Sequence, residues 1–279
     1  VSDAITLPTG WTRPQSLTWG PLGWVAFGYH ASTNWQRVQT SSDFLSWTTV
    51  DVGTAGRWEF GAADDDGTVI TIEFGVAGTN KVLRSQDGGA TWGAVGSLGA
   101  SAQWYSVQWM GDKFIATPNG STAARQSTDG GASWSSLTMP ANNVNVFGGP
   151  GRYLAVSSSS AYYLSTNGGS SWGSSISALS GINSYSTRLY KGRLVVCPLA
   201  GSTVYYSDDG VTWARSTLQH SVGSGPRLFE VVSGVLYLIA SDGKVQFSVD
   251  GKTWRYAGAT ATSGQQQLGL GSYVDIQAS

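Results

Sequence analysis

The chain carries little charge of either sign. Lys and Arg together number 16 and Asp and Glu 17 among 279 residues, so the formal net charge is −1. A nucleic-acid-binding surface needs a cluster of basic side chains, and an acidic interaction tail needs a run of like charges. The composition therefore excludes both classes of protein.

Cysteine and histidine are almost absent as well. Cys197 is the one cysteine, and His30 and His220 are the two histidines. A single cysteine excludes an internal disulfide framework. Two distant histidines and one cysteine also lack the ligand spacing of a zinc site. We predict that the protein uses no metal ion and no cofactor.

Long apolar runs are missing too. The longest, residues 231–240, is interrupted by Ser233 and Gly234 and is too short to cross a bilayer, so we expect no membrane insertion. The chain begins at Val1 without the charged and apolar regions of a secretory signal. We expect it to be a processed chain or a segment of a larger assembly.

Glycine and tryptophan, by contrast, are abundant, at 38 and 13 residues, and many of them belong to one recurring motif. Ser127 to Trp134 reads STDGGASW, and related stretches occur along the chain. The tryptophans that close the six copies are separated by 38 to 45 residues and lie at positions 47, 92, 134, 172, 213 and 254. A period of about 40 residues is typical of propellers and solenoids.

Each copy of the motif has the chemistry of a tight turn between two strands. Asp-Gly or Gly-Gly supplies the positive φ that such turns need. The Asp or Asn side chain can accept hydrogen bonds from backbone N–H groups of its own turn, and Trp supplies a large apolar plate. The motif therefore predicts a β-hairpin followed by a packed tryptophan in every repeat.

This pattern resembles the Asp-box, S-x-D-x-G-x-x-W, of the sialidase-like (BNR-repeat) β-propellers. The resemblance implies an all-β, six-bladed propeller with four antiparallel strands per blade and the Asp-box at each turn between the third and fourth strands. It also implies a structural role for the acidic or amide residue of each motif. These residues are Asp43, Asp87, Asp129, Asn167, Asp209 and Asp250.

The repeat runs through nearly the whole chain and predicts a single domain over residues 1–279. The expected blades are residues 15–50, 57–98, 104–138, 143–178, 185–218 and 227–258. Residues 4–8 and 268–276 flank the repeats. They are candidates for a strand that closes the ring, or for a connector to another domain or subunit.

The resemblance also implies a ligand face opposite the Asp-boxes, around the starts of the innermost strands. The site expected there comprises Arg57, Trp104, Asn145, Tyr185 and Arg227. Aromatic faces beside Arg and Asn suit a sugar or another polar ligand. The alternative is structural: the polar residues begin strands, and Trp104 packs between blades.

Sialidases of this family hold a substrate carboxylate with three arginines and use a tyrosine nucleophile paired with a glutamate. Tyr185 with Glu59 or Glu230 would be that pair, but Thr12-Arg13-Pro14 lacks the aliphatic residue of the family's Arg-Ile-Pro motif. We therefore expect a fold without the family's active site. The hypothesis is a non-catalytic binding or structural module of a phage tail or other surface-exposed assembly.

Such a module would be extracellular or virion-associated and would have other subunits as partners. Low charge and Gly/Ser/Thr-rich loops suit that location. Its ligand would be a glycan or a protein receptor. The alternative function is a sialidase-type glycoside hydrolase.

Overall fold

A computed structural model describes residues 11–30, 36–43, 46–94, 96–142, 144–157, 160–179, 186–223, 228–232 and 234–260. The chain divides into two compact units, Val1–Asn143 and Val144–Ala278. Each unit holds three antiparallel sheets in which consecutive strands are neighbours. The flanking segments 4–8 and 268–276 lie outside the described residues, so their role as closing strands stays a prediction.

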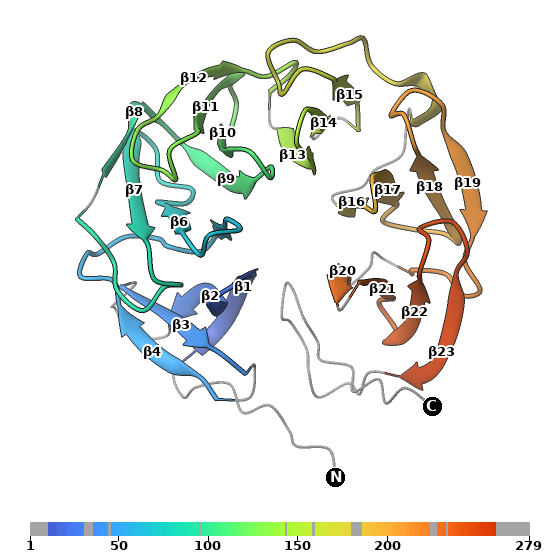
Figure 1. The fold of residues 1–279 in the computed structure, drawn as a ribbon, viewed down its shortest axis with the longest axis horizontal. Helices are drawn as coiled ribbons and strands as arrows, with labels where there is room; N and C mark the ends of the chain where they lie inside the picture. The colour runs from blue at the N-terminus through green and yellow to red at the C-terminus, as the bar shows by residue number, and fades with distance from the viewer. Residues whose placement is uncertain are drawn as a thin grey trace. The chain divides into compact units, whose positions relative to one another are not determined.

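The first unit contains three four-stranded sheets (Figure 1). Their strands are β1 (Trp11–Gly20), β2 (Gly23–His30), β3 (Arg37–Ser41) and β4 (Thr48–Asp51); β5 (Gly61–Ala63), β6 (Val69–Ile72), β7 (Thr79–Ser85) and β8 (Gly96–Ala102); and β9 (Trp104–Trp109), β10 (Phe114–Pro118), β11 (Ala123–Ser127) and β12 (Ser135–Thr138).

The second unit contains one three-stranded and two four-stranded sheets. Their strands are β13 (Val144–Gly149), β14 (Arg152–Ser157) and β15 (Tyr162–Ser165); β16 (Ser186–Tyr190), β17 (Arg193–Cys197), β18 (Thr203–Ser207) and β19 (Ala214–Thr217); and β20 (Leu228–Val232), β21 (Val235–Ile239), β22 (Lys244–Ser248) and β23 (Arg255–Thr260).

The fourth blade corrects the prediction of four strands in every repeat. After β15, the backbone N–H of Gly173 donates to Leu164 O and that of Ile176 to Tyr162 O. The chain then turns into a short 3-10 helix, η1 (Ser177–Leu179), and buries Leu179. Two isolated bonds do not make a ladder, so the segment covers the sheet edge without forming a strand.

Within each unit, the hydrophobic cores lie between successive sheets. Along β7, Leu83 belongs to the cluster between the first two sheets, whereas its neighbour Val82 belongs to the cluster between the second and third. This follows from the strand geometry, in which successive side chains point to opposite faces. A sheet buried on both faces in this way packs against a neighbour on each side.

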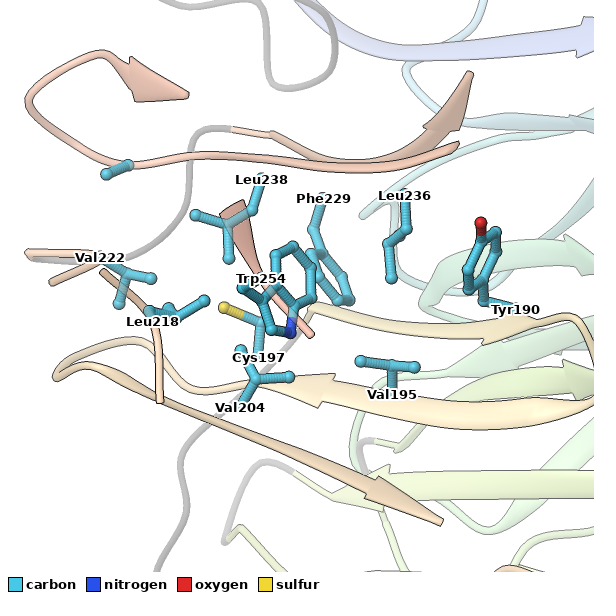
Figure 2. Packing of buried hydrophobic residues seen from close by; sticks show 11 residues of the cluster. Tyr190, Val195, Cys197, Val204, Leu218, Val222, Phe229, Leu236, Leu238 and Trp254 are labelled. Atoms are coloured by element: carbon cyan, nitrogen blue, oxygen red, sulfur yellow. The ribbon is translucent and has the colours of Figure 1, made fainter. Parts of the chain in front are cut away.

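A cluster of the same kind joins the last two sheets of the second unit. Figure 2 shows Cys197, Phe229 and Trp254 together in it, and the two aromatic rings stack with centroids 6.1 Å apart. Burial raises the pKa of the Cys197 thiol far above its ordinary value. Cys197 is therefore a buried apolar residue, as its place in an apolar strand predicts.

The six sheets are the blades of a six-bladed β-propeller, four-stranded in all but the fourth blade. In the part of the chain described, no helix is long and apolar enough to cross a lipid bilayer.

Candidate binding site in the first unit

The six repeated turns share one hydrogen-bond pattern. In each, the hydroxyl of the first Ser donates to the side-chain oxygen of the Asp or Asn two residues later, over 2.7 to 3.0 Å. That oxygen also accepts a backbone N–H from later in the same turn, over 2.7 to 2.9 Å. The polar residues of the motif thus satisfy one another and the turn's own backbone.

These hydrogen bonds favour the charged form of the acidic residues. Bonds from the Ser133 hydroxyl and the Ser133 backbone N–H lower the pKa of Asp129 from 3.8 to about 2. The backbone N–H of Thr212 is the main cause of the lowered pKa of Asp209. The copy at Asn167 makes the same bonds with an amide, and its Nδ2 donates to Ser171 Oγ over 2.8 Å. The turns therefore work with a charged or a neutral residue.

The glycines of these turns allow one blade to pack closely against the preceding blade. A Cβ atom at Gly131 would lie 2.2 Å from Ile70 Cδ1 of the second sheet, and one at Gly89 would lie 2.9 Å from Val25 Cγ2 of the first. In the second unit, a Cβ at Gly210 would lie 2.6 Å from Leu164 Cδ1. The turns thus occupy space between blades, and glycine is required there for close approach as well as for positive φ.

Of the five residues predicted to bind a ligand, the structure describes the surroundings of three. Tyr185 and Arg227 lie outside the described residues. Asn145, on β13 in the second unit, pairs with Val156 of β14 and is half-buried. Arg57 and Trp104 belong to the first unit, and whether all five residues converge stays a prediction.

The structure contradicts the prediction that Trp104 binds a ligand. Its side chain is fully buried in the cluster between the second and third sheets, and its Nε1–H donates to Thr79 O over 3.0 Å. An indole with no exposed face cannot stack on a ligand, so the structural alternative describes this residue. The side chain of the next residue, Tyr105, lies on the opposite face of β9 and is 45% exposed.

Tyr105 belongs to a row of three aromatic rings beside Arg57. The ring centroids of Phe60 and Phe74 are 4.7 Å apart, and those of Phe74 and Tyr105 are 4.9 Å apart. The Arg57 guanidinium lies 5.4 Å from the centroid of Phe74, within cation–π range. We call these four residues the aromatic–arginine cluster. Each of its members is at least partly exposed.

Backbone pairing brings the cluster together from distant parts of the sequence. The segment after β6 contains Phe74, whose N–H donates to Arg57 O over 2.8 Å. The same residue forms a parallel bridge with Trp104, and Gly75 N donates to Trp104 O over 2.8 Å. The loop between β6 and β7 is thus bonded to the start of the second blade and to the start of the third. This bonding holds the three rings side by side.

An amide network borders the cluster. Gln103 Nε2 donates to Gly75 O over 2.9 Å, and Asn119 Nδ2 donates to Gln103 Oε1 over 2.7 Å. The Asn119 side chain is exposed, at the loop between β10 and β11. Amides beside aromatic faces give a ligand both polar and apolar contacts, as in typical binding sites.

Two glutamates near the cluster are engaged in the protein's own contacts. Glu59 accepts from Nη2 of Arg57 over 2.7 Å, and its side chain is 6% exposed. Glu73 accepts from Lys81 Nζ over 3.1 Å and from the Thr79 hydroxyl, and its side chain is 7% exposed. Both carboxylates are buried and paired. Glu59 therefore holds the Arg57 side chain in place, and Glu73 holds the β6–β7 loop.

The acidic turn at residues 64–66 also has a structural explanation. Asp64 Oδ1 accepts the backbone N–H groups of Asp66 and Thr68, over 3.0 and 2.7 Å. Asp65 accepts from the indole of Trp109 over 3.3 Å. Within the described ranges, no group of three or more His, Cys, Asp or Glu side chains is placed to hold a metal ion.

The fold defines the class of protein as a β-propeller, and several solved propellers resemble it. YCF48 bound to D1 peptide has a TM-score of 0.64 and 18% identity, covering 90% of this chain and 82% of that one. A catalytically inactive virginiamycin B lyase from Staphylococcus aureus with quinupristin has a TM-score of 0.67 and 12% identity, covering 90% and 85%.

A third resemblance is to the GH74 enzyme of Niastella koreensis, with a TM-score of 0.63 and 18% identity. It covers 90% of this chain but 38% of the enzyme. No protein-family profile and no curated protein sequence matches the chain. Because these structures share a fold and differ in function, the likeness shows the propeller alone.

Proposed function

We propose that the protein is a non-catalytic binding module that takes its ligand at the aromatic–arginine cluster. The observation that carries this proposal is the row of Phe60, Phe74 and Tyr105 beside Arg57. Partly exposed aromatic rings next to a guanidinium combine an apolar surface with directed N–H donors. Such residues dominate the energetics of binding surfaces, where Tyr and Arg are enriched.

The ligand chemistry that fits this surface is a glycan or a segment of a protein receptor. A sugar presents C–H groups to a ring face and hydroxyls to Gln103 and Asn119. A peptide presents apolar side chains to the rings and carbonyls to Arg57. The likeness to YCF48, whose structure holds a peptide, supports the second ligand class by analogy of fold.

A glycan array and a receptor-peptide library, both probed with the whole chain, test the proposal. Tyr105→Ala should weaken the binding of any hit by at least about tenfold, because an exposed ring at such a site is worth about 1–3 kcal/mol and 1.4 kcal/mol is one decade. The matched control is Trp19→Ala, which removes an aromatic ring that is 60% exposed at the other end of the strands. Equal loss in both variants would show that the cluster is not the site.

The alternative, a sialidase-type hydrolase, is tested with a fluorogenic sialoside. We expect no turnover, since the buried Glu59 carboxylate is bonded to Arg57. Turnover that is lost in Tyr185→Phe would establish the hydrolase and refute the non-catalytic module.

We further propose that the chain is an Asp-box propeller displayed on a phage tail or another surface assembly, either extracellular or virion-associated. The hydrogen bonds shared by the six turns support the Asp-box assignment, and the low charge supports the location. Antibodies against the chain should label intact particles or cells without permeabilisation. Labelling only after lysis would refute the location.

A further inference from the structure

A pocket of about 460 Å³ lies at the opposite strand ends of the first unit from the aromatic–arginine cluster. Its walls come from Val82 and Arg84 of β7, from residues 86–87, 91–94 and 96 after that strand, and from Gly131 and Ala132 in the turn of the third blade. Strand β7 connects the two regions, and Arg84 lies roughly 17 Å along it from Thr79, at the end of the strand that is nearer the cluster. The pocket is therefore distinct from the proposed binding site.

Arg84 is the unusual residue in this pocket. Its Nε atom is shielded from solvent and has no hydrogen-bond partner, and its side chain has no hydrogen bond or ion pair with any described residue. A buried polar group without a partner destabilises the folded state, and a charged group does so more strongly. The guanidinium reaches toward the next turn, where a Cβ at Gly130 would lie 3.1 Å from Nη2.

Other blades place different residues at this position, immediately before the Ser of the turn. In the third blade it is Gln126, and in the fourth it is Leu164, which fills the space beneath Gly210. The fold therefore accepts neutral residues here and does not need an arginine. A buried polar atom without a partner breaks the rule that such atoms are hydrogen-bonded, and where nothing in the structure compensates for it, a functional role is the usual reason.

Two further residues, Trp92 and Asp87, add an aromatic surface and a charged hydrogen-bond acceptor to the pocket. The Trp92 indole is held by its Nε1–H bond to Gly89 O, over 3.0 Å, and by an edge contact with Phe27. It provides a fixed, partly exposed plate. Burial raises the pKa of Asp87, but hydrogen bonds from Thr91 and Ser85 lower it on balance, so the carboxylate is charged at neutral pH. The pocket thus offers a cation, a ring and a hydrogen-bond acceptor.

We propose that this pocket binds a hydroxylated monocarboxylate, the chemistry of an acidic sugar. Arg84 would bind the ligand's carboxylate through the N–H groups of its two terminal nitrogens. Trp92 would cover the ligand's C–H face, and Asp87 would accept hydrogen bonds from the ligand's hydroxyl groups. Arginine suits planar carboxylates because its donors form a fixed fork. A doubly charged phosphate or sulfate fits less well, because one arginine would face two negative charges beside Asp87.

Calorimetric titration and saturation-transfer NMR with D-glucuronate test this proposal on the whole chain. Wild-type protein should bind D-glucuronate at least about tenfold more tightly than D-glucose, which lacks the carboxylate. Arg84→Gln should abolish that preference while the melting temperature stays at or above the wild-type value, since Gln126 occupies the same place in the third blade. Arg84→Lys should retain part of the preference, because it keeps the charge and loses the fork.

Arg125→Gln is the matched control. Arg125 also has a buried Nε without a hydrogen-bond partner among the described residues, but its Nη1 donates to Ser136 and it does not line the pocket. It should bind D-glucuronate as the wild type does. Failure of the wild type to bind D-glucuronate, or equal affinity in Arg84→Gln, would overturn the proposal. So would equally tight binding of sulfate, or tighter binding of N-acetylalanine, which carries a peptide's carboxylate.

Discussion

Removing the acidic residue of the third turn tests how the repeated motif stabilises the fold. Asp129 accepts three hydrogen bonds: from Ser127 Oγ over 2.7 Å, from Ser133 N over 2.9 Å and from Ser133 Oγ over 2.5 Å. Asp129→Ala removes all three. Asp129→Asn keeps an acceptor in place, as the native amide at Asn167 does in the fourth blade.

The size of the effect follows from the number and exposure of these bonds. An intramolecular hydrogen bond contributes about 0.5–1.5 kcal/mol net. The carboxylate is exposed, so water replaces part of what the alanine variant loses. We expect Asp129→Ala to lower the free energy of unfolding by about 1–2 kcal/mol and Asp129→Asn to lower it by less than half of that. Ligand binding at the aromatic–arginine cluster should stay unchanged in both variants.

The pH dependence gives a second, independent measurement. The pKa of Asp129 is lowered from 3.8 to about 2, so the folded state favours the charged form. Its contribution is therefore fully present above the unfolded pKa and is lost as the pH falls through the folded pKa. The stability difference between wild type and Asp129→Ala should be constant from about pH 7 to about pH 5 and should shrink below about pH 4.

Urea denaturation followed by tryptophan fluorescence measures these differences for the three proteins across that pH range. Equal loss in the alanine and asparagine variants would refute the hydrogen-bond explanation. A difference that persists undiminished at the lowest pH would refute the role of the charged form. Loss of ligand binding at an unchanged melting temperature would show that the turn is functional instead of structural.

Three further predictions follow from packing. Gly131→Ala should destabilise the protein by about 2–5 kcal/mol in urea denaturation, because its Cβ would meet Ile70 at a positive φ; a loss below about 1 kcal/mol would contradict the close approach. Trp104→Ala should cost about 3–5 kcal/mol of stability, measured in the same way, because the side chain is fully buried; a ligand-binding defect at full stability would contradict this. Cys197 should resist alkylation by iodoacetamide in the native protein and react after denaturation, because burial raises its thiol pKa; rapid native labelling would contradict its burial.

The sequence predicted what depends on local contacts. The repeat period indicated six blades, and each turn motif indicated the hairpin between the last two strands of a blade, which forms in every blade but the fourth. Ser127, Asp129 and Ser133 lie within seven residues of one another, so their hydrogen bonds need no distant partner. The buried Cys197 was predictable for a similar reason, since it lies in an apolar strand.

The proposed binding surface was harder to predict because it depends on which face of a strand each side chain occupies. Trp104 and Tyr105 are adjacent aromatic residues at the start of a strand, and a one-residue change of register exchanges their faces. The sequence pattern favoured Trp104, but the structure buries it and exposes Tyr105. Phe60 and Phe74 were missed altogether, although an aromatic residue next to Gly75 was an available signal for a residue in a loop.

The sequence by itself determined the class of fold, the number of blades and the turns that repeat, because these depend on hydrogen bonds and spacing along the chain. Only the tertiary structure decided that the fourth blade keeps three strands and that Arg84, in a pocket, has no partner among the residues that the structure describes. It also decided that Arg57 lies beside a row of aromatic rings. These features depend on which residues of neighbouring sheets meet, and that packing joins positions tens of residues apart.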